Sequence, residues 1–391
     1  MQLSPTFRLL SLAVLSSLFF AAAGNSQSIT YVGVYSSDGR FHAPSKFDRW
    51  SNAASPDVEP ESLRPAEVPA WVNLHPIEQT VANYQPPSRA VSPKAPSSWA
   101  TLRDNIITFA YGHERLISAP QRVIVDSNDR VILADPAGSA VHVLGKTKTF
   151  RILTGAGRRV WKPAGLAVDA DDNIYIADPE QGVIAEYDPE GSFLRYIGKL
   201  GSNESLFHLP TGIAIDRRTG TLYVLDTERH ALFLLDLEGR LVRRIGRYTT
   251  NDARADFEYP TDIAVGDGEL AILDAAGTRI WITDLAGKPR QKFSVALHDH
   301  PDMTDRLGIG MDAAGNVYLS NAGDSSVRVY NRAGELLQSL GSLGSGAGEF
   351  RAPTGLWIDA HGRLFVADES ARRVQVFQLS APKQLLMAVG E

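Results

Sequence analysis

Residues 350–377 read FRAPTGLWIDAHGRLFVADESARRVQVF and contain three short apolar runs separated by polar residues. The runs are Leu356–Asp359, Leu364–Ala367 and Val374–Phe377. Runs of this length are too short for a helix and are typical of β-strands. A polar turn at residues 360–362 separates the first two runs. The stretch therefore predicts short strands joined by tight turns.

The same order of parts recurs upstream, and this repetition is the most informative feature of the chain. The fifth unit keeps Gly308–Asp312 without a proline, whereas the other units begin at Pro120, Pro163, Pro210, Pro260 and Pro353. The first four prolines are 43, 47 and 50 residues apart. A period of this size with four short strands per unit is what a β-propeller blade requires. We therefore predict an all-β fold, a six-bladed β-propeller of four-stranded antiparallel blades, over residues 104–391.

The first strand of each unit carries small residues such as Gly165, Gly212 and Gly308, as expected where inner strands crowd around an axis. The last blade needs an outer strand, because an open edge would invite pairing with other chains. Two segments match that position, Ile106–Tyr111 and Leu385–Val389. We favour Ile106–Tyr111, because the residues that follow it resemble the linkers between blades.

The first residues are typical of an export signal. Arg8 precedes an apolar segment at Leu9–Phe20, and Ala21–Ala23 supplies small residues before a cleavage point. The apolar segment is shorter than the roughly 18 residues of a membrane span, and an uncleaved anchor is the alternative. We predict a signal peptide at residues 1–23 and a mature protein that is periplasmic or secreted, with no membrane span.

Residues 24–103 are rich in proline, serine and alanine, a composition typical of an extended linker. One piece of it, Ile29–Tyr35, could form a strand. The chain has a net charge of −6 and no cysteine. The negative charge disfavours nucleic acid as a partner. The lack of cysteine excludes disulfides, thiolate zinc sites and cysteine nucleophiles.

The units resemble the NHL repeat over about residues 105–377. The last unit matches it best, through Gly346–Phe350, Pro353–Gly355, Gly362–Asp368 and Arg373–Phe377. The Asn-His-Leu triplet that names the family is poorly matched in this sequence. Residues 229–230 are its best partial match. The resemblance implies a six-bladed propeller and leaves the function open, because propellers serve both as binding modules and as enzymes.

An enzymatic relative, the peptide-amidating lyase, is similar in architecture and looks to bind zinc through histidines just after the blade proline. Here those positions hold Ala164, Thr211, Thr261 and Thr354, so that ligand set does not carry over. A lactonase-type calcium site cannot be assembled from the sequence either. A metal-dependent lyase or hydrolase with its site at the channel mouth is the alternative function.

One local cluster, His298, His300 and Asp302, combines imidazole with carboxylate. Such a combination suits zinc or similar ions, although a solvated loop is the alternative explanation. We expect no cofactor, and zinc or calcium are the ions that the alternative function would use.

An acidic residue ends the second strand of most units: Asp135, Asp178, Asp226, Asp274 and Asp368, with Asn321 in the fifth unit. A carboxylate at a strand end accepts backbone hydrogen bonds and fixes a turn. We predict this local structural role for the acids.

Two departures from the repeat suggest a ligand site. Where other units have Gly165, Gly212 and Gly355, the first unit has Arg122 and the fourth has Asp262. Units one and four are opposite each other in a six-bladed ring, so both side chains should project near one mouth of the channel. We hypothesise that they flank a small polar or charged ligand, and two solvated rim charges are the alternative.

The loops between units supply further candidate ligand-binding residues, Trp161, Lys162, His208, Tyr259 and Arg351. Phe207, Phe257 and Phe350 recur at one repeat position and are equally well explained by packing between blades. The favoured function is an exported, non-catalytic binding scaffold. We expect a monomer that presents a loop face to a protein, peptide or glycan in the cell envelope.

Overall fold

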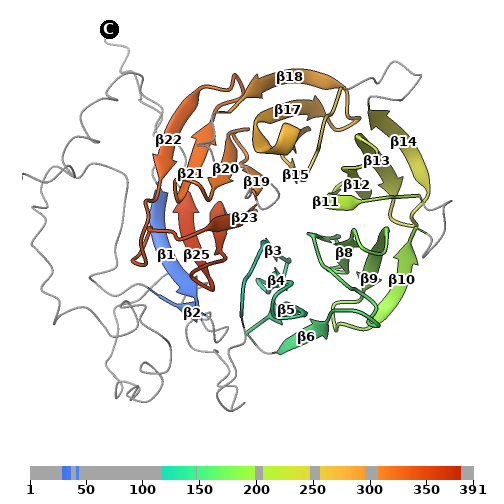
Figure 1. Ribbon diagram of the computed structural model, residues 1–391, viewed down its shortest axis with the longest axis horizontal. Helices are drawn as coiled ribbons and strands as arrows, with labels where there is room; N and C mark the ends of the chain where they lie inside the picture. The colour runs from blue at the N-terminus through green and yellow to red at the C-terminus, as the bar shows by residue number, and fades with distance from the viewer. Residues whose placement is uncertain are drawn as a thin grey trace, which may run out of the picture.

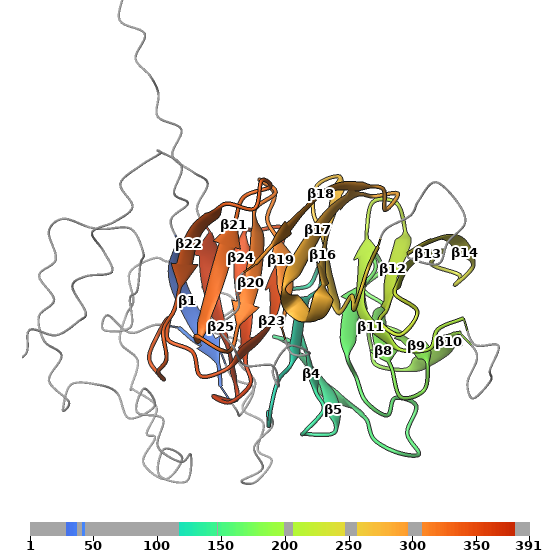
Figure 2. The same ribbon diagram turned by 45° about the horizontal axis from the view of Figure 1, so that its top comes forward.

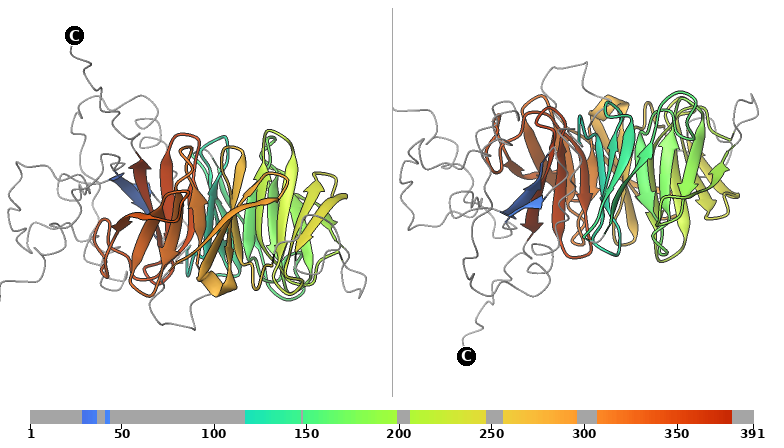
Figure 3. Two further views of the ribbon diagram at one scale, coloured as in Figure 1. Left: turned by 90° about the horizontal axis from the view of Figure 1, so that it is seen from above. Right: turned by 90° about the horizontal axis from the view of Figure 1, so that it is seen from below.

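The computed structural model describes residues 29–36, 41–43, 117–146, 148–198, 206–246, 256–295 and 307–379. In this part of the chain, six β-sheets stand around a common axis as the blades of a propeller (Figure 1). Turned from that view, the sheets are seen to stand side by side in a disc (Figures 2 and 3). The predicted all-β, six-bladed propeller is confirmed.

Each of the first five blades is a four-stranded antiparallel sheet. Blade 1 contains β3 (Arg122–Val125), β4 (Val131–Asp135), β5 (Ala140–Leu144) and β6 (Thr149–Leu153). Blade 2 contains β7 (Gly165–Val168), β8 (Ile174–Asp178), β9 (Val183–Tyr187) and β10 (Phe193–Ile197). Blade 3 contains β11 (Pro210–Asp216), β12 (Thr221–Asp226), β13 (Ala231–Asp236) and β14 (Leu241–Gly246).

Blade 4 contains β15 (Asp262–Val265), β16 (Glu269–Asp274), β17 (Arg279–Asp284) and β18 (Pro289–Ser294), with the short 3₁₀ turn η2 (Ala275–Gly277) after β16. Blade 5 contains β19 (Ile309–Met311), β20 (Val317–Asn321), β21 (Ser326–Tyr330) and β22 (Leu336–Leu340). In each blade the first strand lies nearest the axis, so β3, β7, β11, β15, β19 and β23 form an inner ring (Figure 1).

The sixth blade combines both ends of the described chain. Its inner strands are β23 (Pro353–Ile358), β24 (Arg363–Asp368) and β25 (Arg373–Leu379), and β1 (Ile29–Tyr35) pairs antiparallel with β25. The two-residue strand β2 (Phe41–His42) adds a fifth strand outside β1. Tyr31 of β1 packs edge-on against Phe377 of β25, with ring centroids 5.6 Å apart. The ring is thus closed by an N-terminal strand.

This closure corrects the sequence prediction. The outer position beside β25 belongs to Ile29–Tyr35, whereas we had favoured Ile106–Tyr111. That segment and Leu385–Val389 lie outside the described residues. Residues 29–36 and 41–43 therefore belong to the propeller and not to the linker predicted at 24–103. The rest of that range, and the signal predicted at 1–23, lie outside the described residues.

A separate cluster of buried apolar side chains lies between each pair of neighbouring blades. A blade consequently has both faces covered only when both of its neighbours are present. Near the axis the inner strands approach so closely that a side chain would not fit: a Cβ atom on Gly165 would lie 2.2 Å from Thr211 O. The predicted need for small residues there is confirmed. No helix among the described residues is long and apolar enough to cross a membrane.

Candidate functional site

A buried aspartate at the end of the second strand fixes the loop that enters each of five blades. Asp135, Asp178, Asp226, Asp274 and Asp368 are all fully buried. In each case the carboxylate accepts hydrogen bonds from two consecutive backbone amides of the preceding loop. The predicted local role of these acids is confirmed by this geometry.

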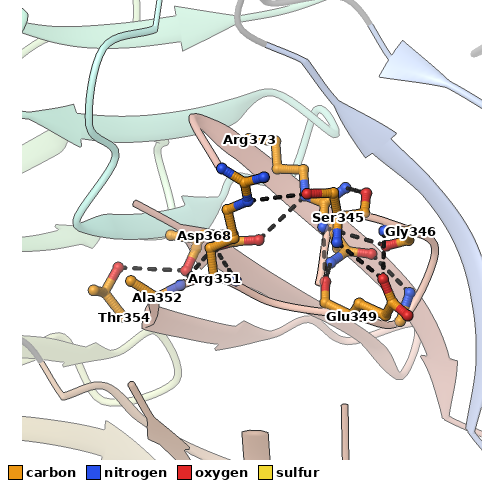
Figure 4. Close-up of polar contacts among 11 residues, drawn as sticks. Ser345, Gly346, Glu349, Arg351, Ala352, Thr354, Asp368 and Arg373 are labelled. Atoms are coloured by element: carbon orange, nitrogen blue, oxygen red, sulfur yellow. Dashed lines mark hydrogen bonds and ion pairs between the residues drawn. The ribbon is translucent and has the colours of Figure 1, made fainter. Parts of the chain in front are cut away.

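Figure 4 shows the arrangement in blade 6. Asp368 Oδ1 accepts from the amides of Arg351 (3.0 Å) and Ala352 (2.9 Å), while its Oδ2 accepts from Arg373 Nε (3.2 Å). The guanidinium of Arg373 also donates to the carbonyl oxygens of Ser345 (2.6 Å) and Glu349 (2.7 Å). One acid and one arginine thereby hold the whole loop before β23.

At least one of the two residues whose amides are held in this way is exposed in blades 2, 3, 4 and 6, and we call the end of the blades that carries these loops the loop face. Trp161 is 44% exposed and Tyr259 is 57% exposed, and Lys162, His208 and Arg351 are exposed as well. The candidate loop residues therefore share one backbone environment in blades 2, 3, 4 and 6. Sequence reasoning missed Leu209, which follows His208 and is 36% exposed.

Trp161 carries the first of the two bound amides in its loop, and Leu209 and Tyr259 carry the second in the next two blades. We refer to these three exposed residues as the loop-face arc. Tyr259 packs edge-on against His230, with ring centroids 5.4 Å apart, and His230 Nδ1 contacts the carbonyl oxygen of Glu258. These contacts limit the motion of the tyrosine ring. The arc is thus a row of exposed apolar side chains on a backbone fixed by buried acids.

Phe207, Phe257 and Phe350, the neighbours of the loop residues, are fully buried. Phe207 packs against Phe233, and Phe257 packs against Trp281, with ring centroids 5.5 Å apart in both pairs. The packing explanation therefore applies to these three phenylalanines. Their rings lie in the cores between blades, and the loop residues that follow them include exposed ones.

Arg122 and Asp262 are the first residues of β3 and β15, which lie on opposite sides of the axis (Figure 1). Glycines stand beside both: a Cβ on Gly355 would lie 2.7 Å from Arg122 Cα, and one on Gly212 would lie 2.7 Å from Asp262 Cα. Both charged residues lie at the loop-face end of the inner ring, because each immediately follows a loop.

Asp262 is only 8% exposed, and two backbone amides hold its carboxylate. Its Oδ1 accepts from Ile263 N and its Oδ2 from Ile309 N of blade 5, both at 3.0 Å. Burial raises the pKa of Asp262 above its ordinary value, and the positive charge of Arg122 opposes that rise. The structure therefore brings the predicted pair within electrostatic range. That the pair flanks a ligand stays a prediction.

Metal-binding side chains form no group of three or more within the described ranges. The cluster of His298, His300 and Asp302 lies outside those ranges. Metal binding by this cluster, with a solvated loop as the other explanation, therefore stays a hypothesis.

Fold and site together define a six-bladed β-propeller in which buried acids fix the loops between blades. Residues 207–233, from the loop before β11 to the middle of β13, match the family model of the NHL repeat. The chain is thus a six-bladed β-propeller with an NHL-repeat match in its third blade, in line with the resemblance seen in the sequence.

Several solved structures resemble this chain over about two thirds of its length. A gluconolactonase from Xanthomonas campestris has 16% identity and a TM-score of 0.51, over 67% of this chain and 86% of that chain. A virginiamycin B lyase from Staphylococcus aureus has 13% identity and a TM-score of 0.48, over 68% and 86% of the two chains. Hydrazine synthase from Kuenenia stuttgartiensis has 15% identity and a TM-score of 0.48, over 69% and 79%. At 16% identity, the gluconolactonase match shows the fold alone. No match is found among curated protein sequences.

Proposed function

We propose that the chain is a non-catalytic binding scaffold that works outside the cytoplasm and holds a protein or peptide ligand on its loop face. The observation that carries this proposal is the loop-face arc, in which Trp161, Leu209 and Tyr259 are exposed at two adjacent repeat positions in consecutive blades. Exposed tryptophan and tyrosine are the residues most enriched among the dominant contacts of protein interfaces.

The backbone beneath the arc adds a second argument. The amides of Trp161 and Tyr259 are bound to Asp178 and Asp274 at 2.5 and 2.8 Å. A loop that is already fixed loses little conformational entropy when a ligand docks, so more of the contact energy appears as affinity. Lys162, His208 and Arg351 would supply polar contacts at the edge of the same surface.

The test uses a random peptide library displayed on phage and selected against the immobilised full chain. We expect selected peptides to bind with a Kd that rises at least tenfold in Trp161→Ala and Tyr259→Ala, measured by isothermal titration calorimetry. Val242→Ser on the outer strand β14, where the valine is 69% exposed, is the matched control and should leave binding unchanged. Peptides that bind all three variants equally well would show that the arc is not the binding surface.

The alternative functions give distinct results. Binding to a glycan array without any peptide binder would change the ligand class. One equivalent of zinc or calcium after dialysis, lost in the double variant His298→Ala/His300→Ala, would favour a metal-dependent lyase or hydrolase. Export is tested by mass spectrometry of the protein isolated from its source, for which we expect an N-terminus near Gly24.

A further inference from the structure

The loop that enters blade 2 carries three cations within five residues. Residues 154–164 connect β6 to β7, and Arg158, Arg159 and Lys162 are all exposed. This loop contains no acidic residue, although the whole chain has a net charge of −6. The residue just before the buried residue of each loop is Arg159 in blade 2, Leu206 in blade 3, Asp256 in blade 4 and Glu349 in blade 6. Blade 2 therefore places a positive charge where two other blades place a negative one.

The main chain around Arg159 is fixed from two sides. Its carbonyl oxygen accepts hydrogen bonds from Gln181 Nε2 at 2.9 Å and from the Tyr196 hydroxyl at 2.8 Å. Two residues later, the amide of Trp161 donates to the buried carboxylate of Asp178 at 2.5 Å. The loop is thus held in place by the blade, and a ligand that docks on it loses little affinity to the ordering of the loop.

The side chain of Arg159 is also held, but its hydrogen-bond donors remain open. The guanidinium carbon lies 4.5 Å from the centroid of the Phe193 ring, and Phe193 packs against Tyr196 with ring centroids 4.7 Å apart. Within the described ranges, the guanidinium of Arg159 makes no hydrogen bond and joins no ion pair. An exposed guanidinium that rests on an aromatic ring keeps its fork of N–H groups for a planar carboxylate.

The acids beside this loop leave it with a surplus of positive charge. Asp178 is buried and bound to amides of the loop. Glu180 lies 3.8 Å from Lys162 Nζ, and both side chains are more than half exposed, so this ion pair is weak. In blades 3 and 4, by contrast, the arginines beside the loops are paired with acids, Arg229 with Asp226 and Arg279 with Glu258.

We infer that the loop entering blade 2 recognises carboxylate side chains, so that the loop face selects acidic segments of a peptide ligand. The ligand's carboxylate accepts two hydrogen bonds from Arg159, and Arg158 and Lys162 add to the positive potential that attracts it. Trp161 packs against an apolar residue of the same peptide. The Cα atoms of Arg159 and Trp161 are at most about 7 Å apart in any conformation, so a short peptide can contact both. The carboxylate site rests on the proposed function, because it gives the charge of the ligand held on that same face.

The first test repeats the phage selection on the full chain and on its double variant Arg158→Gln/Arg159→Gln. We expect peptides selected on the wild type to contain more aspartate and glutamate than the unselected library, and peptides selected on the double variant to lose that excess. Arg151→Gln, which removes an exposed arginine from β6, is the matched control and should keep it. Peptides without an acidic excess that still require Trp161 and Tyr259 would overturn the carboxylate site and leave the proposed function standing. A library that yields no binder would overturn both.

Calorimetry then assigns the carboxylate to its partner. Replacing the acidic residues of a selected peptide by their amides should raise the Kd about tenfold on the wild type and less than about twofold on the double variant. Arg159→Lys should lie between, because lysine keeps the charge without the fork, and it serves as the test if the double variant fails to fold. The same rise on the wild type and on both variants would refute the assignment. A heparin oligosaccharide that binds more tightly than every selected acidic peptide would overturn the ligand class.

Discussion

The buried acid of blade 6 offers the sharpest test of how the loop face is held. In Asp368→Ala, the amides of Arg351 and Ala352 lose an acceptor now 3.0 and 2.9 Å away. Arg373, with 8% of its side chain exposed, loses the one carboxylate with which it forms an ion pair in the described part of the chain. Hydrogen bonds to a charged group contribute about 1.5–3 kcal/mol each, and breaking a buried pair costs about 3–5 kcal/mol. These terms overlap, so we expect a loss of about 4 to 6 kcal/mol in unfolding free energy.

Asp368→Asn should cost less, about 2 to 3 kcal/mol. Both amides bond to the same oxygen, Oδ1, and an asparagine can keep that oxygen in place. Its NH₂ group would then face Arg373 Nε, which now donates to Oδ2. Two donors would meet, and the arginine would lose its counter-charge. The double variant Asp368→Asn/Arg373→Gln should therefore be more stable than the sum of the single effects predicts.

The assay is guanidinium unfolding followed by circular dichroism, with Tm as a second readout. For Asp368→Ala we expect Tm to fall by about 10 to 20 °C. The control is Asp188→Ala, because Asp188 also accepts two amides, Glu190 N at 3.0 Å and Ser192 N at 2.7 Å, but in an exposed turn. We expect it to cost under about 1 kcal/mol. Equal losses in the two variants would refute the idea that burial of the acid holds the loop.

Three further outcomes follow from the structure. Gly165→Ala should lower the unfolding free energy by about 1–3 kcal/mol in guanidinium titrations, because the new Cβ would lie 2.2 Å from Thr211 O; an unchanged midpoint would contradict the close approach. Deleting residues 29–43 should open the edge of β25 and produce oligomers in size-exclusion chromatography, and a stable monomer would show that β1 is dispensable. Burial alone would raise the pKa of Asp135, but hydrogen bonds from His142 and backbone amides outweigh it and lower the pKa below 3.8. Its stabilisation is present above that value and is lost as pH falls through the lowered pKa, so Asp135→Asn should flatten the pH dependence of urea unfolding below about pH 4.

The blades could be predicted from the sequence because each is built mainly from consecutive strands. The run Val131–Asp135 was predicted and is β4, and it pairs with β5 across a turn of only four residues. The role of the buried acids was predictable for the same reason, since Asp178 reaches amides only 16 and 17 residues earlier in the chain. Pairing between strands that are close in the sequence gives a repeating pattern of apolar runs and turns, which a single sequence shows.

The strand that closes the ring, β1, is not part of this repeating pattern. Ile29 pairs with Leu379, so the match depends on contacts between opposite ends of the chain. Ile106–Tyr111 has an equally suitable apolar pattern and lies closer to blade 1 in sequence. What β1 adds is a tertiary fit, such as Tyr31 against Phe377. The exposure of Leu209 was missed for a related reason, because which side of a loop faces solvent depends on the acid that binds its amides.

The way in which the loops are held explains how one face can be specialised without cost to the fold. The buried acid contacts backbone amides, so the structural demand falls on the main chain and leaves the side chains of those two residues free to vary. They do vary: blade 1 places Ser118 and Ala119 there, whereas blade 2 places Trp161 and Lys162 and blade 4 ends the loop in Tyr259. The residue just before the two is buried and apolar in each of these blades, as Ile117, Val160, Phe207, Phe257 or Phe350. Variation on a fixed backbone, concentrated in the outward positions of adjacent blades, is what a recognition surface requires.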